Sequence, residues 1–277
     1  MIYKSRRTGI KHIRERSGFE NMWTLITILS VIAVSQAGRL PESFHGRVIN
    51  GEDAVLGEIP YQVSLQYVYN NFHFCGGSVL NEKYVITAAH CIQGKSPSQI
   101  KVIAATVDLK DPQSEFKVEK IIKHTKYNSY DSWVHDIALI KIKDEFVVNK
   151  VLNFVSLPPK GYVVPEKAVA RISGWGSLWE GGMSPDVLQK AEIETAEHNY
   201  CKQVYKNIAL NIYQTHLCAY DPVESTGSCH GDSGGPLVVD EKLVGLVSWA
   251  NGCASTKYPT VYTRVTEYLD WIEENAV

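Results

Sequence analysis

The chain has 277 residues, which is enough to bury one large hydrophobic core or two smaller ones. Its 28 Lys and Arg nearly balance its 30 Asp and Glu, but residues 1–47 hold eight of the basic residues and only three of the acidic ones. Residues 48–277 therefore carry 20 basic against 27 acidic residues, a net charge of −7. This acidic balance argues against binding to a phosphate backbone, so we expect no nucleic-acid partner.

The N-terminal segment has the pattern of a secretory signal. A basic stretch within residues 1–21 precedes an apolar core at 22–34, and the small residues Ser35 and Ala37 follow at the spacing of a cleavage site. The core of 13 residues is too short for a membrane span, which needs about 20. We expect a secreted, extracellular protein with a signal peptide that ends at Ala37 and no membrane anchor. Residues 1–21 are either a long leader or lie upstream of a start at Met22.

Six cysteines follow this signal. An even number in a secreted chain predicts that all are paired, in three disulfides, although 15 pairings are possible. No CxxC pair is present, which argues against a zinc site. The cysteines are Cys75, Cys91, Cys201, Cys218, Cys229 and Cys253.

Short alternating runs dominate the chain after residue 47 and predict an all-β protein, either a sandwich or a barrel. A Pro- and Gly-rich segment at 156–165 is the best linker candidate and divides residues 48–277 into two similar halves. Near the C-terminus, apolar residues at i, i+3, i+4 and i+7 predict a helix; these are Val265, Tyr268, Leu269 and Ile272. The expected strands are 61–67, 83–89, 101–109, 137–142, 167–176, 242–250 and 260–265.

The stretch GSCHGDSGGP, residues 227–236, contains a candidate nucleophile. A serine hydroxyl reacts at neutral pH only with a base, a group that orients the base, and donors for the oxyanion. Ser233 is the candidate serine, and the surrounding glycines allow the backbone N–H groups of Gly231 and Ser233 to converge on one point. The alternative is that glycines around a serine form an ordinary turn.

Two further motifs contain the remaining candidates. His90 in VITAAHC follows a strand and is flanked by small residues and a cysteine, a setting suited to a rigid general base. Asp136 in HDIALIKI opens an apolar strand, where a partly buried carboxylate needs a partner such as an imidazolium. The other histidines lack this context. We expect His73 and His135 to be structural or surface groups, and His124 and His230 to be solvent-facing or cleft-lining.

Taken together, residues 48–277 resemble a chymotrypsin-type serine endopeptidase, the family from which the general description of the triad is drawn. The motifs TAAHC, DIAL and GDSGGP occur in the family's order, His, Asp and Ser, together with GWG and SWANGC. The resemblance implies two six-stranded antiparallel barrels packed face to face, with the active site between them. It implies a first barrel at about 48–155, a second at about 166–262, and a C-terminal helix at about 263–276.

The resemblance also implies roles for individual residues. His90 is the general base and then the general acid, Asp136 orients it, Ser233 forms the acyl-enzyme, and Ser248 donates a hydrogen bond to the buried aspartate. No cofactor is implied. The loop 108–115 lacks an evident carboxylate cage, so no metal site is carried over from relatives that bind calcium. The implied disulfides are Cys75–Cys91, Cys201–Cys218 and Cys229–Cys253.

RVING, at residues 47–51, resembles the family's activation site. Cleavage after Arg47 frees a new terminus at Val48, whose ammonium pairs with Asp232 in the family. Because no cysteine is spare, the activation peptide 38–47 is expected to be released. The implied partners are protein or peptide substrates, an activating protease that cleaves after Arg47, and protein protease inhibitors, with the enzyme itself a monomer.

Specificity is expected to depend on the S1 pocket, which binds P1, the residue on the acyl side of the cleaved bond. By the resemblance its base is Gly227 and its walls are Ala250 and Thr260, none of them acidic. A P1 Arg or Lys would be desolvated without a countercharge, so the expected specificity is apolar, chymotrypsin- or elastase-like. Two alternatives remain open: a trypsin-like processing protease, and a secreted non-catalytic homologue that binds partners.

Overall fold

The computed structural model describes residues 48–277. The expected signal peptide, the activation peptide and Arg47 lie outside the described residues. In the described part of the chain, none of the helices combines the length and the apolar character needed to cross a bilayer.

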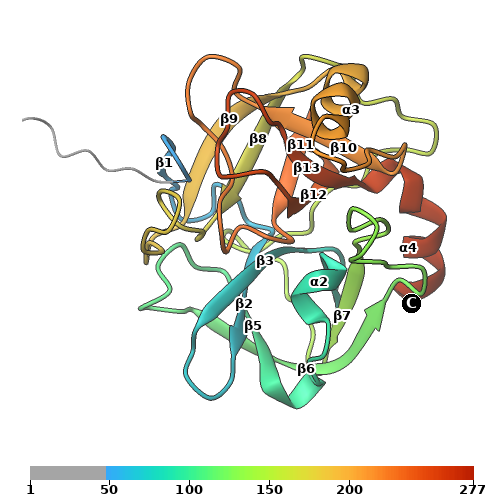
Figure 1. Ribbon diagram of the computed structural model, residues 1–277. Helices are drawn as coiled ribbons and strands as arrows, with labels where there is room; N and C mark the ends of the chain where they lie inside the picture. The colour runs from blue at the N-terminus through green and yellow to red at the C-terminus, as the bar shows by residue number, and fades with distance from the viewer. Residues whose placement is uncertain (1–47) are drawn as a thin grey trace, which may run out of the picture. The chain divides into compact units, whose positions relative to one another are not determined.

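The first half of the described chain forms a closed antiparallel barrel (Figure 1). Its strands follow one another around the ring in the order β2-β3-β4-β7-β6-β5. Period-two alternation divides their side chains between two cores. Val85 points into the barrel, whereas its neighbours Tyr84 and Ile86 join a second cluster that also contains Leu243 and Leu246 from the other half of the chain. The strands are β2 (Gln62–Tyr67), β3 (His73–Val79), β4 (Tyr84–Thr87), β5 (Ile100–Ala104), β6 (Ser114–Lys123) and β7 (Ala138–Ile142).

The second half forms the other barrel. Its strands lie in the order β9-β10-β13-β12-β11-β8, and a pairing between β8 and β9 closes the ring. The shared cluster of buried side chains joins the two barrels, which confirms the predicted all-β, two-barrel fold. The strands are β8 (Val169–Gly174), β9 (Gln189–Thr195), β10 (His216–Tyr220), β11 (Pro236–Val239), β12 (Lys242–Trp249) and β13 (Thr260–Arg264).

The helices are few and short. The predicted C-terminal helix is present as the 3-10 turn η2 (Val265–Tyr268) followed by α4 (Leu269–Asn275), and its four periodic apolar residues are all buried in the shared cluster. It begins at 265 rather than 263, because Thr263 and Arg264 still pair in the sheet. The other helices are α2 (Ala89–Ile92), η1 (Pro97–Gln99) and α3 (His198–Lys206).

Two further expectations differ from the structure. The short strand β1 (Glu52–Asp53) pairs with β9, so the start of the segment expected in the first barrel belongs to the second. Val48 supports this, because its side chain packs in the second barrel's core. The strand expected at 101–109 ends at Ala104, since Ala105 adopts a left-handed conformation with φ +57° that breaks the extended backbone.

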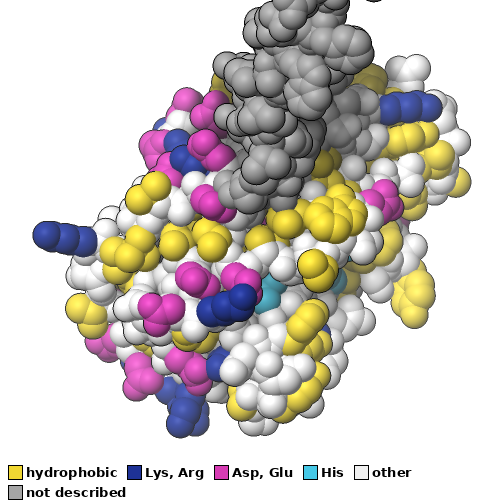
Figure 2. Space-filling view, turned by 90° about the vertical axis from the view of Figure 1, so that its left-hand side faces the viewer, with side chains coloured by type: hydrophobic (Ala, Val, Ile, Leu, Met, Phe, Trp, Pro, Cys, Tyr) yellow, Lys and Arg dark blue, Asp and Glu magenta, His cyan; other side chains and the backbone are white. Residues whose placement is uncertain are grey.

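Charged side chains of both signs are interspersed on the face shown in Figure 2, with hydrophobic side chains exposed between them. This face therefore presents a mixed surface rather than a field of one sign.

Three disulfides tie the loops around the barrels, with the pairing that the resemblance implies. Cys75–Cys91 links β3 to α2, Cys201–Cys218 links α3 to β10, and Cys229–Cys253 joins the two loops that precede β11 and β13. No free cysteine remains in residues 48–277.

Candidate active site

His90 and Asp136 are brought together at the edge of the first barrel. His90 lies in the single turn of α2, directly after β4, and Asp136 precedes β7. The His90 Nδ1–H donates to Asp136 Oδ2 at 2.7 Å, and the His90 backbone N–H donates to Oδ1 at 2.8 Å. Because a carboxylate only accepts, the proton of the neutral imidazole sits on Nδ1 and leaves Nε2 free to accept another.

The second barrel holds this aspartate in place. The Asp136 side chain is fully buried, at 0% exposure. Ser248 on β12 donates its hydroxyl to Asp136 Oδ2 at 2.6 Å, and Thr263 on β13 donates to the Asp136 carbonyl oxygen at 2.7 Å. The carboxylate therefore has three donors, as a buried charge requires.

Ser233 lies in the loop before β11, held by both barrels. Its carbonyl oxygen accepts from the Gly76 N–H of β3 at 2.8 Å, and the N–H of Gly234 donates to Val247 of β12, also at 2.8 Å. The same carbonyl lies 3.5 Å from Cys91 Sγ, in the residue that follows His90. Within residues 48–277, no hydrogen bond joins Ser233 Oγ to His90 Nε2. Such contacts often tighten only when substrate is bound.

Asp232 anchors the backbone beside Ser233. Its side chain is buried, and its two carboxylate oxygens accept from the N–H groups of Gly176 at 2.9 Å and Cys229 at 2.8 Å. Burial raises the pKa of this carboxyl to about 6, although both backbone donors act in the opposite direction. The GWG motif leaves room for it, because a Cβ on Gly174 or Gly176 would overlap the Asp232 carboxylate.

His73, at the start of β3, contacts the loop that carries Gly231 and Ser233. Its Nδ1 lies 2.7 Å from Ser64 Oγ, and its Nε2 lies 3.0 Å from the Gly231 carbonyl oxygen. Burial lowers the pKa of His73 to about 4, so the ring is neutral, donates from Nε2 to Gly231 and accepts at Nδ1 from Ser64. A structural role was expected from the sequence. His73 lies 158 residues before Gly231 in the sequence, so no local sequence pattern indicates this contact. Gly231 itself has φ +99°.

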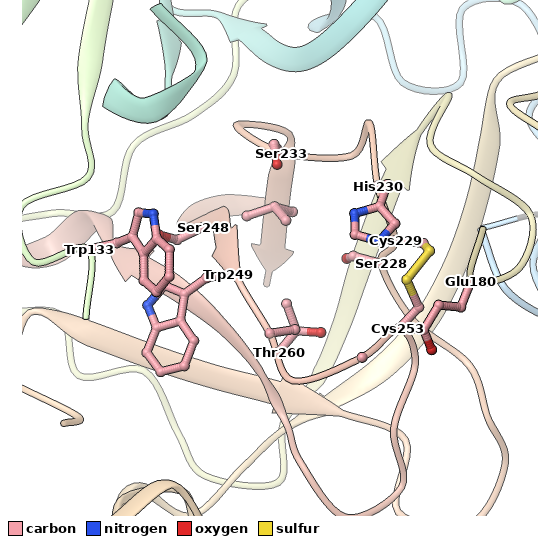
Figure 3. A pocket seen from close by; sticks show the side chains of 13 residues that line it. Trp133, Glu180, Ser228, Cys229, His230, Ser233, Ser248, Trp249, Cys253 and Thr260 are labelled. Carbon is pink, nitrogen blue, oxygen red and sulfur yellow. A yellow bond between two sulfur atoms is a disulfide. The ribbon is translucent and has the colours of Figure 1, made fainter. Parts of the chain in front are cut away.

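A cavity of about 260 Å³ opens beside Ser233. Figure 3 shows Ser233 at one end and Thr260 at the other, with Trp133 and Trp249 on one side and His230 on the opposite side. The two tryptophan rings stack with centroids 5.7 Å apart. The full lining is Trp133, Glu180, Ser228, Cys229, His230, Ser233, Val247, Ser248, Trp249, Ala250, Gly252, Cys253 and Thr260.

Two of the three expected pocket residues, Ala250 and Thr260, line this cavity, and Gly227 does not. Gly227 is packed away from it: its backbone N–H donates to Ile49 at 3.3 Å, and a Cβ built on it would lie 3.1 Å from Ala254 Cα. Glu180 and Trp133 line the cavity without having been predicted. Both come from loops of other parts of the chain, and nothing in their local sequence indicates that contact.

Two clusters bring metal-ligand atoms together among the described residues: Cys75, His90 and Cys91, and Cys229, His230 and Cys253. In each the two cysteines form a disulfide with one another, so neither sulfur is available as a thiolate ligand.

Comparison with known proteins gives a consistent result. The family model described as Trypsin matches residues 48–272. Trypsin-1 of Astacus astacus is 39% identical over 242 residues, covering 83% of this chain and 100% of the relative. Trypsin epsilon of Drosophila erecta is 35% identical over 260 residues, covering 92% and 99%. Trypsin Blo t 3 of Blomia tropicalis is 35% identical over 266 residues, covering 91% and 98%.

Proposed function

Since the chain belongs to the trypsin family of serine endopeptidases, we propose that it cleaves peptide bonds after apolar P1 residues, with Ser233, His90 and Asp136 as its catalytic triad. Its substrates, like those of the family, are proteins. The observation that carries the apolar specificity is the cavity beside Ser233, whose expected P1-binding residues Ala250 and Thr260 are both uncharged.

The chemistry follows from the hydrogen bonds of the site. Ser233 Oγ attacks the carbonyl carbon of the scissile bond while His90 Nε2 takes its proton, and Asp136 stabilises the imidazolium that forms. The N–H groups of Gly231 and Ser233 donate to the oxyanion. Collapse of the tetrahedral intermediate breaks the C–N bond, and His90 returns the proton to the leaving amine. Water then enters, gives its proton to His90 and releases the acyl group from Ser233.

The residues that line the cavity determine which P1 side chains are favoured. An apolar P1 residue buries its surface against Trp249 and Val247, whereas an Arg or Lys would lose its hydration with no carboxylate at positions 227, 250 or 260. The names of the relatives favour trypsin-like specificity, which is the second candidate. It would need a carboxylate deep in the cavity, whereas the one acidic residue among the described lining residues, Glu180, is exposed to solvent.

The proposal includes secretion and synthesis as a zymogen. Three disulfides suit an oxidising compartment. Cleavage after Arg47 would create an ammonium at Val48, next to a side chain that is only 1% exposed within the second barrel. Asp232 is the buried carboxylate that this cation would pair with. Because the expected P1-binding residues Ala250 and Thr260 offer arginine no countercharge, a second protease with basic specificity would perform the cleavage.

Steady-state hydrolysis of matched peptides tests this function. The activated enzyme is given peptides that differ only in having Leu, Phe, Arg or Lys at P1, with the Ser233→Ala variant as the inactive control. We expect kcat/KM for Leu or Phe to exceed that for Arg by about 100-fold or more, given a desolvation penalty of several kcal/mol. A preference for Arg would establish the trypsin-like alternative. A fluorophosphonate should label the native enzyme and leave the alanine variant unlabelled.

A further inference from the structure

We propose that Glu180 is a specificity-determining residue that binds a cationic side chain of the substrate, one or two positions away from the apolar P1 residue. The inference rests on the proposed function and extends it to a substrate class, peptides with a basic residue beside an apolar one.

Glu180 is placed at the rim of the substrate cavity. It lines the cavity together with Gly252 and Cys253, and Figure 3 shows it beyond the Cys229–Cys253 disulfide, on the side away from Trp249. Glu180 Oε2 lies 3.6 Å from the position that a Cβ on Gly252 would take, so the exposed carboxylate lies beside the loop that lines the cavity.

An ordered turn presents this carboxylate. The Gly182 N–H donates to the Trp179 carbonyl at 2.9 Å, and the Leu178 N–H donates to the Met183 carbonyl at 3.2 Å. Gly181 has φ +73°, which suits the third position of a type II turn. The Trp179 ring lies where a Cβ on Gly182 would be and so packs against that backbone. Glu180 therefore occupies the second position of a closed turn.

The charge of Glu180 is not neutralised by the protein. No ion pair to Glu180 is present in residues 48–277, and it is the one carboxylate among the cavity-lining residues of that range. The only other titratable group among them is His230. A Lys or Arg of the substrate near this rim would meet an unpaired, solvent-exposed carboxylate.

Because Glu180 lies at the rim of the cavity, we expect it to bind a substrate residue next to P1 and not P1 itself. A cation drawn fully into the cavity loses its hydration, whereas a cation beside the rim keeps most of it and still gains the attraction. Exposed ion pairs contribute modestly and are screened by salt. We therefore expect a selectivity of about 3- to 5-fold for a neighbouring basic residue, reduced at high ionic strength.

Peptide scanning with a charge-neutralised variant tests the inference. Leu is kept at P1. The positions P3, P2, P1′ and P2′ in turn carry either Lys or the uncharged Gln. The enzymes are the native protein, Glu180→Gln, and Glu274→Gln, which removes an exposed carboxylate on α4 that forms no ion pair in the described chain. We expect a Lys/Gln ratio in kcat/KM of about 3 to 5 at one or two positions for the native enzyme and Glu274→Gln, near 1 for Glu180→Gln, and near 1 for all three in 0.5 M salt.

The Gln peptides separate selectivity from general damage. The inference is supported if Glu180→Gln cleaves them as the native enzyme does. It is overturned if Glu180→Gln keeps the native Lys/Gln ratio, or if it slows all peptides equally. Failure of the proposed function has a different signature, because all three enzymes would then cleave after the scanned Lys residues rather than after Leu.

Discussion

Two buried aspartates flank the candidate nucleophile, and they are stabilised in different ways. Asp136 is held by a histidine ring and a serine hydroxyl as well as by a backbone N–H. Asp232 has two backbone N–H donors and, within residues 48–277, no cationic partner. Burial raises the pKa of Asp232 to about 6, a sign that its charge is costly where it lies.

The two aspartates therefore differ in when the charge of the carboxylate gains its partners. Asp136 has side-chain partners that exist as soon as the two barrels fold. Asp232 needs a cation that, in our proposal, appears only when the chain is cut before Val48. In our proposal the first aspartate serves the chemistry directly, and the second couples chain cleavage to the loop that carries Gly231 and Ser233.

Replacing Asp136 by Asn should have the largest effect. The amide can donate to His90 Nδ1, which stabilises the tautomer with its proton on Nε2 and removes the acceptor for the Ser233 proton. We expect kcat to fall by about 10⁴-fold, the magnitude for this exchange in the family that serves as the template for the triad. Single-turnover hydrolysis of a Leu peptide measures the fall. A loss below about 10-fold would contradict the role of Asp136.

Replacing Asp232 by Asn should lower kcat only in the chain that has been cleaved before Val48. In the cleaved chain the Val48 ammonium would lose its charged partner, and kcat should fall by about 10² to 10³-fold as the oxyanion donors lose their positions. In the native sequence, cleavage should raise the free energy of unfolding by about 3 kcal/mol through the new ion pair, and in Asp232→Asn it should not. Denaturant unfolding of both forms of each protein provides the measurement. An equal gain in both sequences would disprove the pairing.

The free energy of unfolding of the uncut chain should depend on pH through the titration of Asp232. Its folded-state pKa of about 6 exceeds the unfolded value of 3.8, so the folded chain binds more protons between these pH values. The contribution of this carboxyl is thus most favourable below about pH 4 and is lost as pH rises to about 6, a change of about 2 to 3 kcal/mol.

Buried His73 acts in the opposite direction, because its folded-state pKa of about 4 lies below its usual 6.5 and its contribution is lost as pH falls. The measurement is therefore the difference in unfolding free energy between the native sequence and Asp232→Asn at pH 4 and pH 7. A difference that does not change with pH would rule out the raised pKa.

Sequence patterns located the parts of the site that depend on local context. The motifs around His90, Asp136 and Ser233 are contiguous, and so are the apolar spacing of the C-terminal helix and the cysteines. These patterns predicted an all-β protein and three disulfides, whereas the two-barrel arrangement and the disulfide pairing were implied by the resemblance to the chymotrypsin-type family. The charged, half-exposed β6 and the glycine-containing β3 were not predicted, because their alternation of apolar and polar residues is weak.

Contacts between distant loops were beyond the reach of those patterns. Gly227 lies outside the cavity lining and packs against Ala254, and the approach of Glu180 to the cavity depends on a turn 48 to 80 residues from the other lining residues of the second barrel. One of the two donors to Asp232, the Gly176 N–H, comes from a motif, GWG, that was recognised by resemblance alone, without the physical reason for its glycines. Only the folded chain shows that each glycine accommodates a carboxylate.

Replacing Ser248 by Ala should have the smallest effect, since it removes one of several donors to Asp136. Asp136 Oδ2 would keep the His90 Nδ1–H and lose the hydroxyl at 2.6 Å. Because Asp136 would then be held less firmly in position against His90, we expect kcat to fall by about 10-fold. With one donor gone, the carboxylate should stabilise the imidazolium more, so the acid limb of the pH–kcat/KM profile should move to higher pH.

Ser228→Ala is the matched control for this variant. Ser228 also lines the cavity and is buried, but its hydroxyl lies 3.1 Å from Tyr262 Oη and does not contact Asp136. It should leave the acid limb where it is. If both alanine variants move the profile equally, the effect comes from the cavity, and Ser248 has no specific role. If Ser248→Ala changes kcat in the native background but not in Asp136→Asn, the hydroxyl acts through that carboxylate, which is what the geometry requires.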